Sequence, residues 1–141
     1  RVGRARVKVL VVSGIWPPDV GGPASHAPEV AAYLRSAGHD VGVVVTAGSA
    51  PAEEPYPVDW ISRSQPAGVR HVRAVGKKYS ACDAVLITSS AWPTLTVIQD
   101  LENDLGKPVV SSSMGQIWWP LKELGIKADI KGYGKLLGTL S

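Results

Sequence analysis

The sequence of 141 residues contains no phenylalanine and only one cysteine, Cys82. A single cysteine cannot form an internal disulfide, which fits a reducing compartment, so a natural version of this chain is expected to be cytoplasmic. The longest apolar run, Val9 to Val12, is far too short to cross a bilayer, and no signal peptide is visible. Neither a membrane partner nor a secreted, disulfide-stabilised fold is therefore expected.

Dense positive charge and metal-ligand spacings are also missing. The net charge is only +3, without the basic stripe that nucleic-acid binding needs. No cluster of His, Cys and carboxylate residues has the spacing of a metal site. The full glycine fingerprint of dinucleotide-binding proteins is absent as well. We therefore expect no metal, no cofactor and no required partner.

Short apolar runs alternate with segments of helical periodicity along the chain. The runs predict five strands, and four helices follow the first, third, fourth and fifth of them. This alternation indicates a three-layer α/β/α fold of the Rossmann-like or flavodoxin-like kind, with a mostly parallel sheet in the order 3-2-1-4-5. The expected strands are 7–12, 41–46, 58–62, 84–88 and 108–111, and the expected helices lie within 25–38, 66–75, 93–106 and 113–125.

Two of the helix starts carry capping signals. Ser25 is expected to cap the first helix, and Ser113 with Gln116 forms a plausible capping box for the last. No repeat, low-complexity segment or shift in composition marks a linker, so residues 1–141 are expected to form a single α/β domain. Trp118 and Trp119 are adjacent in the last helix and cannot both face the core, and an exposed one could favour weak self-association.

The expected strand order places a crevice between the first and fourth strands. Ligands of such sheets bind outside the carboxyl ends of the strands at this point. Each candidate also has a purely structural reading, as a tight turn, a helix cap, an exposed first-turn histidine or a packed tail residue. The candidates for binding a small anion such as phosphate or sulfate are Gly21, Gly22, Ser25, His26, Ser89, Ser90, Ser112 and Tyr133.

The first half of the chain, about residues 5–75, carries a strand, a glycine loop and a step into the second strand. Residues 7–13, Pro17–Pro23 and Arg35–Val41 resemble the N-terminal domain of GT-B glycosyltransferases of the family 4 type. The resemblance implies that the glycine loop approaches substrates in a cleft between two domains. Most of the sugar-nucleotide site belongs to the second domain of that family, so glycosyl transfer is not expected.

The second half, about residues 78–138, carries the segments 83–89, 105–113 and 132–137. They resemble the C-terminal part of the aspartate/glutamate racemase superfamily, in particular arylmalonate decarboxylase and maleate isomerase. The resemblance implies a catalytic cysteine at the end of the fourth strand. Ser89 stands at that position here, and because a hydroxyl is a far weaker acid than a thiol, it is only a vestigial candidate.

Two family resemblances in one chain favour a recombined or engineered chimera, with a glycosyltransferase-like segment at about 1–76 and a racemase-like segment at about 77–141. The leading hypothesis is a folded α/β domain without catalytic activity. One alternative is an anion- or nucleotide-binding module in the crevice between the first and fourth strands. The other is a residual racemase- or decarboxylase-like enzyme that uses Ser89.

Overall fold

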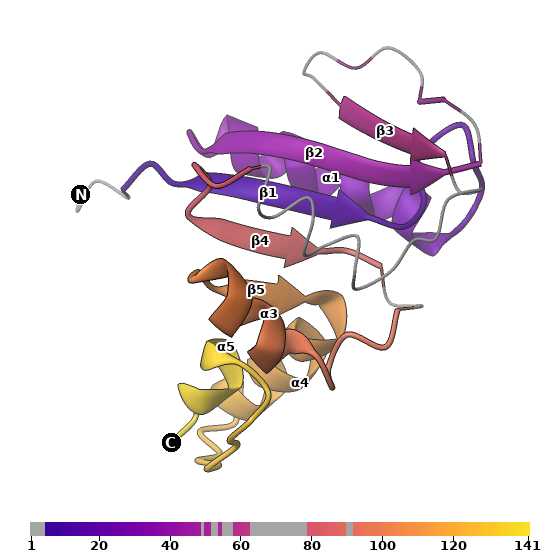
Figure 1. Cartoon of the computed structure of the whole chain (residues 1–141). Coiled ribbons are helices and arrows are strands. Elements are labelled where there is room, and N and C mark those ends of the chain that lie inside the picture. Colours follow the sequence, from indigo (N-terminus) through magenta and orange to yellow (C-terminus); the bar gives the residue numbers. More distant parts are fainter. Residues whose placement is uncertain (1–4, 49, 52–53, 55–57, 63–78, 90–91) are drawn as a thin grey trace.

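The computed structural model describes residues 5–48, 50–51, 54, 58–62, 79–89 and 92–141. The helix expected within 66–75 and the expected joint near residue 76 lie outside the described residues. The elements are, in chain order (Figure 1), β1 (Lys8–Ser13), α1 (Gly22–Ser36), β2 (Asp40–Ala47), β3 (Val58–Ser62), β4 (Ala84–Ile87), α3 (Ile98–Leu105), β5 (Val109–Ser111), α4 (Ser112–Glu123) and α5 (Lys135–Gly138).

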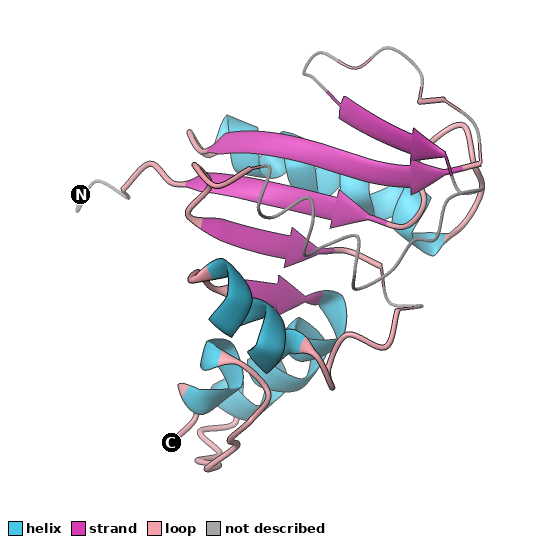
Figure 2. Cartoon of the chain, in the orientation of Figure 1, coloured by secondary structure: helices cyan, strands magenta, loops and turns pink. Residues whose placement is uncertain are grey.

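The five strands form one sheet in the order β3-β2-β1-β4-β5, and every neighbouring pair is parallel. The predicted α/β class and strand order are therefore confirmed. Val12 of β1 lies opposite Val44 of β2 and Ile87 of β4. Figure 2 shows all the strand arrows ending at the same edge of the sheet, so the loops that follow the strands leave from that edge.

Alternate residues of each strand face opposite sides of the sheet, so the sheet separates two cores. On one side, Val11 of β1 packs with β2 and with Ala27 and Ala31 of α1. On the other side, Val12 of β1 packs with Leu101 of α3 and with buried residues of β4, β5, α4 and α5. Figure 1 shows α1 behind β1 and β2, and α3 in front of β5. The helices thus form the two outer layers.

Two helices begin earlier than the sequence predicts. The N-cap of α1 is Gly21, and Ser25 lies in the first turn, where its amide donates to the Gly21 carbonyl at 3.2 Å. The expectation that Ser25 caps this helix is therefore wrong. The N-cap of α4 is Ser111, whose Oγ accepts a hydrogen bond from the Met114 amide at 3.3 Å. Because the last residue of β5 already caps the helix, no capping box forms at Ser113.

A buried carboxylate connects three elements of the second half. Glu102 of α3 is only 3% exposed. Its Oε1 accepts a hydrogen bond from the Val109 amide at 3.0 Å, and its Oε2 accepts one from the Lys135 amide at 2.9 Å. The same side chain therefore fixes the start of β5 and the start of α5. This arrangement satisfies a charge that would be costly to bury without hydrogen bonds.

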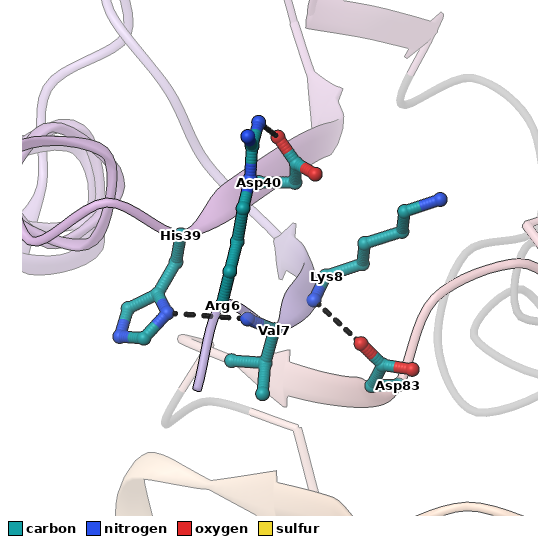
Figure 3. A network of polar contacts seen from close by, with 6 residues as sticks. All are labelled: Arg6, Val7, Lys8, His39, Asp40 and Asp83. Atoms are coloured by element: carbon teal, nitrogen blue, oxygen red, sulfur yellow. Dashed lines mark hydrogen bonds and ion pairs between the residues drawn. The ribbon is translucent and has the colours of Figure 1, made fainter. Parts of the chain in front are cut away.

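Polar contacts also connect the amino ends of the three central strands (Figure 3). The Lys8 amide donates to Oδ2 of Asp83 at 2.7 Å, and the Val7 amide donates to Nδ1 of His39 at 3.4 Å. Arg6 pairs with Asp40, and this hydrogen bond lowers the pKa of the Asp40 carboxyl below its ordinary value. These contacts lie at the edge of the sheet opposite the carboxyl ends.

The role of Glu102 can be tested by Glu102→Gln. Glutamine keeps one acceptor oxygen but turns an N–H donor toward one of the two backbone amides, so we expect the free energy of unfolding to fall by about 2 kcal/mol. Urea denaturation measures the change. Glu123→Gln makes the same substitution at an exposed position of α4 and should change stability by less than about 0.5 kcal/mol. Equal effects of the two substitutions would contradict the role of Glu102 in fixing the starts of β5 and α5.

The Arg6–Asp40 pair predicts a pH effect of definite sign. Because the pKa of Asp40 is lowered in the folded state, the pair adds stability above the ordinary aspartate pKa, and this stability is lost as the pH falls through the lowered value. Arg6→Gln should move the pKa of Asp40 back toward its ordinary value in an NMR titration of its carboxyl carbon. Lys131→Gln, which removes the partner of Asp129, is the control and should leave Asp40 unchanged.

Candidate functional site

The carboxyl ends of β1, β4 and β5 meet at one edge of the sheet. β1 and β4 pair in parallel up to Val12 and Ile87, and Ile87 pairs in turn with Ser111 of β5. The residues that follow these strands therefore emerge side by side. Gly14 follows β1, and Thr88 and Ser89 follow β4. This is the switch point at which open α/β sheets bind their ligands.

Ser89 is held directly against the end of β1. The residue is 4% exposed. A Cβ atom added to Gly14 would lie only 2.6 Å from Oγ of Ser89, which means that the backbone of Gly14 touches this hydroxyl. No hydrogen bond between described residues uses the Ser89 hydroxyl. The hydroxyl is therefore positioned by packing, and its O–H group can donate a hydrogen bond to a ligand.

The neighbouring hydroxyls have structural roles. Oγ of Ser13 donates to the Ile15 carbonyl at 2.6 Å, and Oγ1 of Thr88 donates to the Val12 carbonyl at 3.3 Å. Ser112, one of the predicted ligand-binding residues, donates its hydroxyl to the carbonyl of Ile87 at 3.4 Å. The Thr88 and Ser112 bonds join neighbouring strand ends, and the Ser13 bond is local to the loop after β1. Ser89 differs from them in having no such partner among the described residues.

The candidates of the glycine loop lie at the start of α1. The hydroxyl of Ser25 donates to the Gly21 carbonyl at 3.4 Å, and Nδ1 of His26 lies 2.8 Å from the Gly22 carbonyl. Both side chains are exposed and bond within their own helical turn. No hydrogen bond among the described residues joins them to Ser89. The structure therefore brings Ser89 and Ser112 to one edge through adjacent strands, but it does not connect them to the glycine-loop candidates.

Tyr133 does not join this group. Tyr133 is 45% exposed and precedes Gly134, whose amide donates to Oε1 of Gln99 at 3.4 Å. A Cβ on Gly134 would lie 2.4 Å from Cγ2 of Ile98, so the tail packs closely against α3 at this point. Ser90 lies outside the described residues.

A pocket that the sequence did not predict lies next to the end of β4. It has a volume of about 280 Å³ and is lined by Trp92, Pro93, Thr94, Leu95, Thr96 and Ser113. Thr94 is 2% exposed, and its Oγ1 has no hydrogen-bond partner. The sequence predicts that the helix within 93–106 begins at Pro93, but α3 begins only at Ile98. The residues before it form the turns that line the pocket.

Two larger hollows lie at the opposite, amino edge of the sheet. One, of about 400 Å³, is lined by residues that include Arg35 and Tyr79, and the other, of about 510 Å³, by residues that include Asp104 and Lys107. Nζ of Lys107 donates to the carbonyls of Ser80 and Cys82 at 2.9 and 2.8 Å. Because ligands of parallel α/β sheets bind at the carboxyl ends, we place the candidate site at Ser89, although the pocket near this edge is smaller than the two at the amino edge.

Within the part of the chain that the structure describes, no helix has the length and apolar character needed to span a membrane. Over the same residues, no three side chains of the metal-binding types come together as a ligand set.

Comparison with known proteins gives one consistent result. A family model described as arylmalonate decarboxylase matches residues 29–137. A solved arylmalonate decarboxylase is similar with a TM-score of 0.63 and 18% identity, over 92% of this chain and 51% of that chain. A search of curated proteins finds no match.

Two solved isomerases are similar to the same extent. One is a cysteine-to-serine variant of maleate cis-trans isomerase from Nocardia farcinica with a covalently bound succinylcysteine intermediate (TM-score 0.64, 21% identity, 94% of this chain and 49% of that chain). The other is a variant of maleate isomerase from Pseudomonas putida S16 with maleate (TM-score 0.61, 21% identity, 93% of this chain and 47% of that chain). The chain spans about half the length of each solved structure, and at these identities the likeness supports the fold.

These findings correct the leading hypothesis of the sequence analysis. A single family model runs through the expected joint near residue 76, so the hypothesis of a chimera is wrong, and the match to an enzyme family contradicts the expectation of a non-enzyme. The racemase-superfamily resemblance is confirmed. The glycosyltransferase resemblance of the first half finds no support, because an apolar strand followed by a glycine loop and a helix is common to many parallel α/β folds.

The contact between Gly14 and Ser89 predicts a non-additive pair of substitutions. Gly14→Ala places its Cβ against Oγ of Ser89 and should lower the free energy of unfolding by about 1–3 kcal/mol. Ser89→Gly removes the clashing side chain, so the double variant should recover much of this loss. Urea denaturation of the wild type, both single variants and the double variant completes the cycle. Strictly additive effects would show that the two residues do not touch.

Proposed function

Since the chain belongs to the arylmalonate decarboxylase family, we propose that it carries part of an enzyme site for carboxylic acids, with the Ser89 hydroxyl at the reacting position. The reaction class is decarboxylation or proton exchange at the carbon beside a carboxylate. The observation that carries this proposal is the placement of Ser89 at the switch point, buried against Gly14 and with its donor unused by the described residues.

Decarboxylation and proton exchange both require a proton donor and hydrogen bonds to a carboxylate. In a decarboxylation, the bond between the central carbon and one carboxylate breaks, and carbon dioxide leaves. The electron pair stays on the carbon and spreads into the remaining carboxylate, which donors at the site must stabilise. The carbon then takes a proton from the Ser89 hydroxyl, which recovers one from water. A hydroxyl is a weaker acid than a thiol, so this serine should support only a slow reaction.

A complete site needs more donors than this edge of the sheet supplies. Most of the hydroxyls near Ser89 already bond to backbone carbonyls, as in Ser13, Thr88 and Ser112. The solved relatives are about twice as long as this chain. We therefore expect this chain, which contributes the proton donor, to hold the substrate carboxylate only weakly. Phosphate or sulfate should compete for the same donors.

The proposal predicts a gain of activity in Ser89→Cys. A thiol at this position is a better proton donor, so the rate of carbon dioxide release from phenylmalonate, or of maleate isomerisation, should rise by about 100-fold over the wild type. Ser89→Ala should abolish the activity. Ser112→Cys places a thiol at the end of the adjacent strand and is the matched control.

Binding gives an independent readout of the same proposal. Malonate should shift the NMR signals of the Thr88 and Ser89 amides before those of any residue at the amino edge of the sheet. Equal rates for Ser89→Cys and Ser112→Cys would contradict the role of Ser89. An absence of both turnover and amide shifts would reject the proposed site altogether.

A further inference from the structure

Trp92 lies directly beside the proposed reacting hydroxyl. Its Cε2 atom lies 3.2 Å from the position that a Cβ on Gly14 would take, and Oγ of Ser89 lies 2.6 Å from the same position. The indole edge and the hydroxyl thus converge on one point of the chain leaving β1. The Trp92 amide donates a hydrogen bond of 3.5 Å to the Ser89 carbonyl.

Trp92 also forms a wall of the 280 Å³ pocket. Ser89 and Gly14 do not line this pocket, so Trp92 is shared between the pocket and the Ser89 side. The other walls include Pro93 and Leu95, which present mainly carbon. An apolar hollow of this size is near the lower end of the volumes that hold small ligands. The indole therefore contributes both to the surroundings of the hydroxyl and to a hollow in which a ring could lie.

We infer that Trp92 determines the size of the acid that can reach Ser89. The inference rests on the proposed function and adds the substrate class: compact dicarboxylic acids without an aromatic substituent. A small acid needs only the space beside the hydroxyl. An aryl-substituted acid that reaches Ser89 must place its ring where the indole lies, because Trp92 occupies the position beside both the hydroxyl and the pocket. Removing the indole joins the two spaces.

The test compares two acids on matched variants. Binding of malonate and phenylmalonate is measured by NMR titration with the wild type, Trp92→Ala and Trp92→Phe. The wild type should bind malonate at least about tenfold more tightly than phenylmalonate, because a filled pocket discriminates by about this factor per added group. Trp92→Ala should tighten phenylmalonate binding about tenfold and leave malonate within about twofold. Trp92→Phe retains an aromatic side chain, so its affinity for phenylmalonate should lie between that of the wild type and that of Trp92→Ala.

Trp119→Ala is the control, because it removes an indole that is 57% exposed on α4. It should leave the ratio of the two affinities unchanged. An unchanged ratio in Trp92→Ala, or equal binding of both acids by the wild type, would overturn the inference while leaving the proposed function in place. Failure of every variant to bind either acid would instead reject the proposed function and the inference with it. If Trp92→Ala does not fold, the ratio of malonate to phenylmalonate affinity in Trp92→Phe tests the inference instead. A ratio equal to that of the wild type would overturn it.

Discussion

The parallel pairing of β1 with β4 brings opposite halves of the sequence into one site. The register that sets Val12 opposite Ile87 also carries the next residues of both strands out at the same edge. Gly14 meets Ser89 there, and the absence of a side chain on Gly14 is what lets the hydroxyl approach the backbone. A shift of one residue in this pairing would turn the alternating side chains to the opposite faces and separate the pair. The site is thus a product of strand register.

The second half depends on a different kind of constraint. Its strands are short, and α5 is a helix of four residues. Such a segment gains little stability from its own hydrogen bonds. Glu102 compensates by accepting the amides of both Val109 and Lys135, and Leu137 then enters the core beside Leu101. Burial of one hydrogen-bonded charge therefore supports the packing of several apolar groups.

The sequence predicts the sheet well because most of its strands are short apolar runs rich in valine, and right-handed connections leave few strand orders. It also predicts Ser89 at a strand end. It misplaces the helix starts because Ser25 and Ser113 each have a competing cap nearby, Gly21 and Ser111. The close approach of Gly14 and the pocket beside Trp92 depend on distances across the fold, which no local pattern contains. The chimera hypothesis is wrong for a related reason: short motifs that are common to many α/β folds do not mark separate origins.

The order in which the chain is synthesised differs from the order in which the two sides of the sheet can be covered. All five strands precede residue 112, so a growing chain on the ribosome can present the whole sheet before α4 is complete. The face that packs with Leu101, however, also requires Leu137 and Leu140, which are synthesised later. Until those leucines arrive, one side of the sheet is without its final cover while the side under α1 can already close. The two faces therefore mature at different times, and the late face is the one for which a nascent chain would need a chaperone.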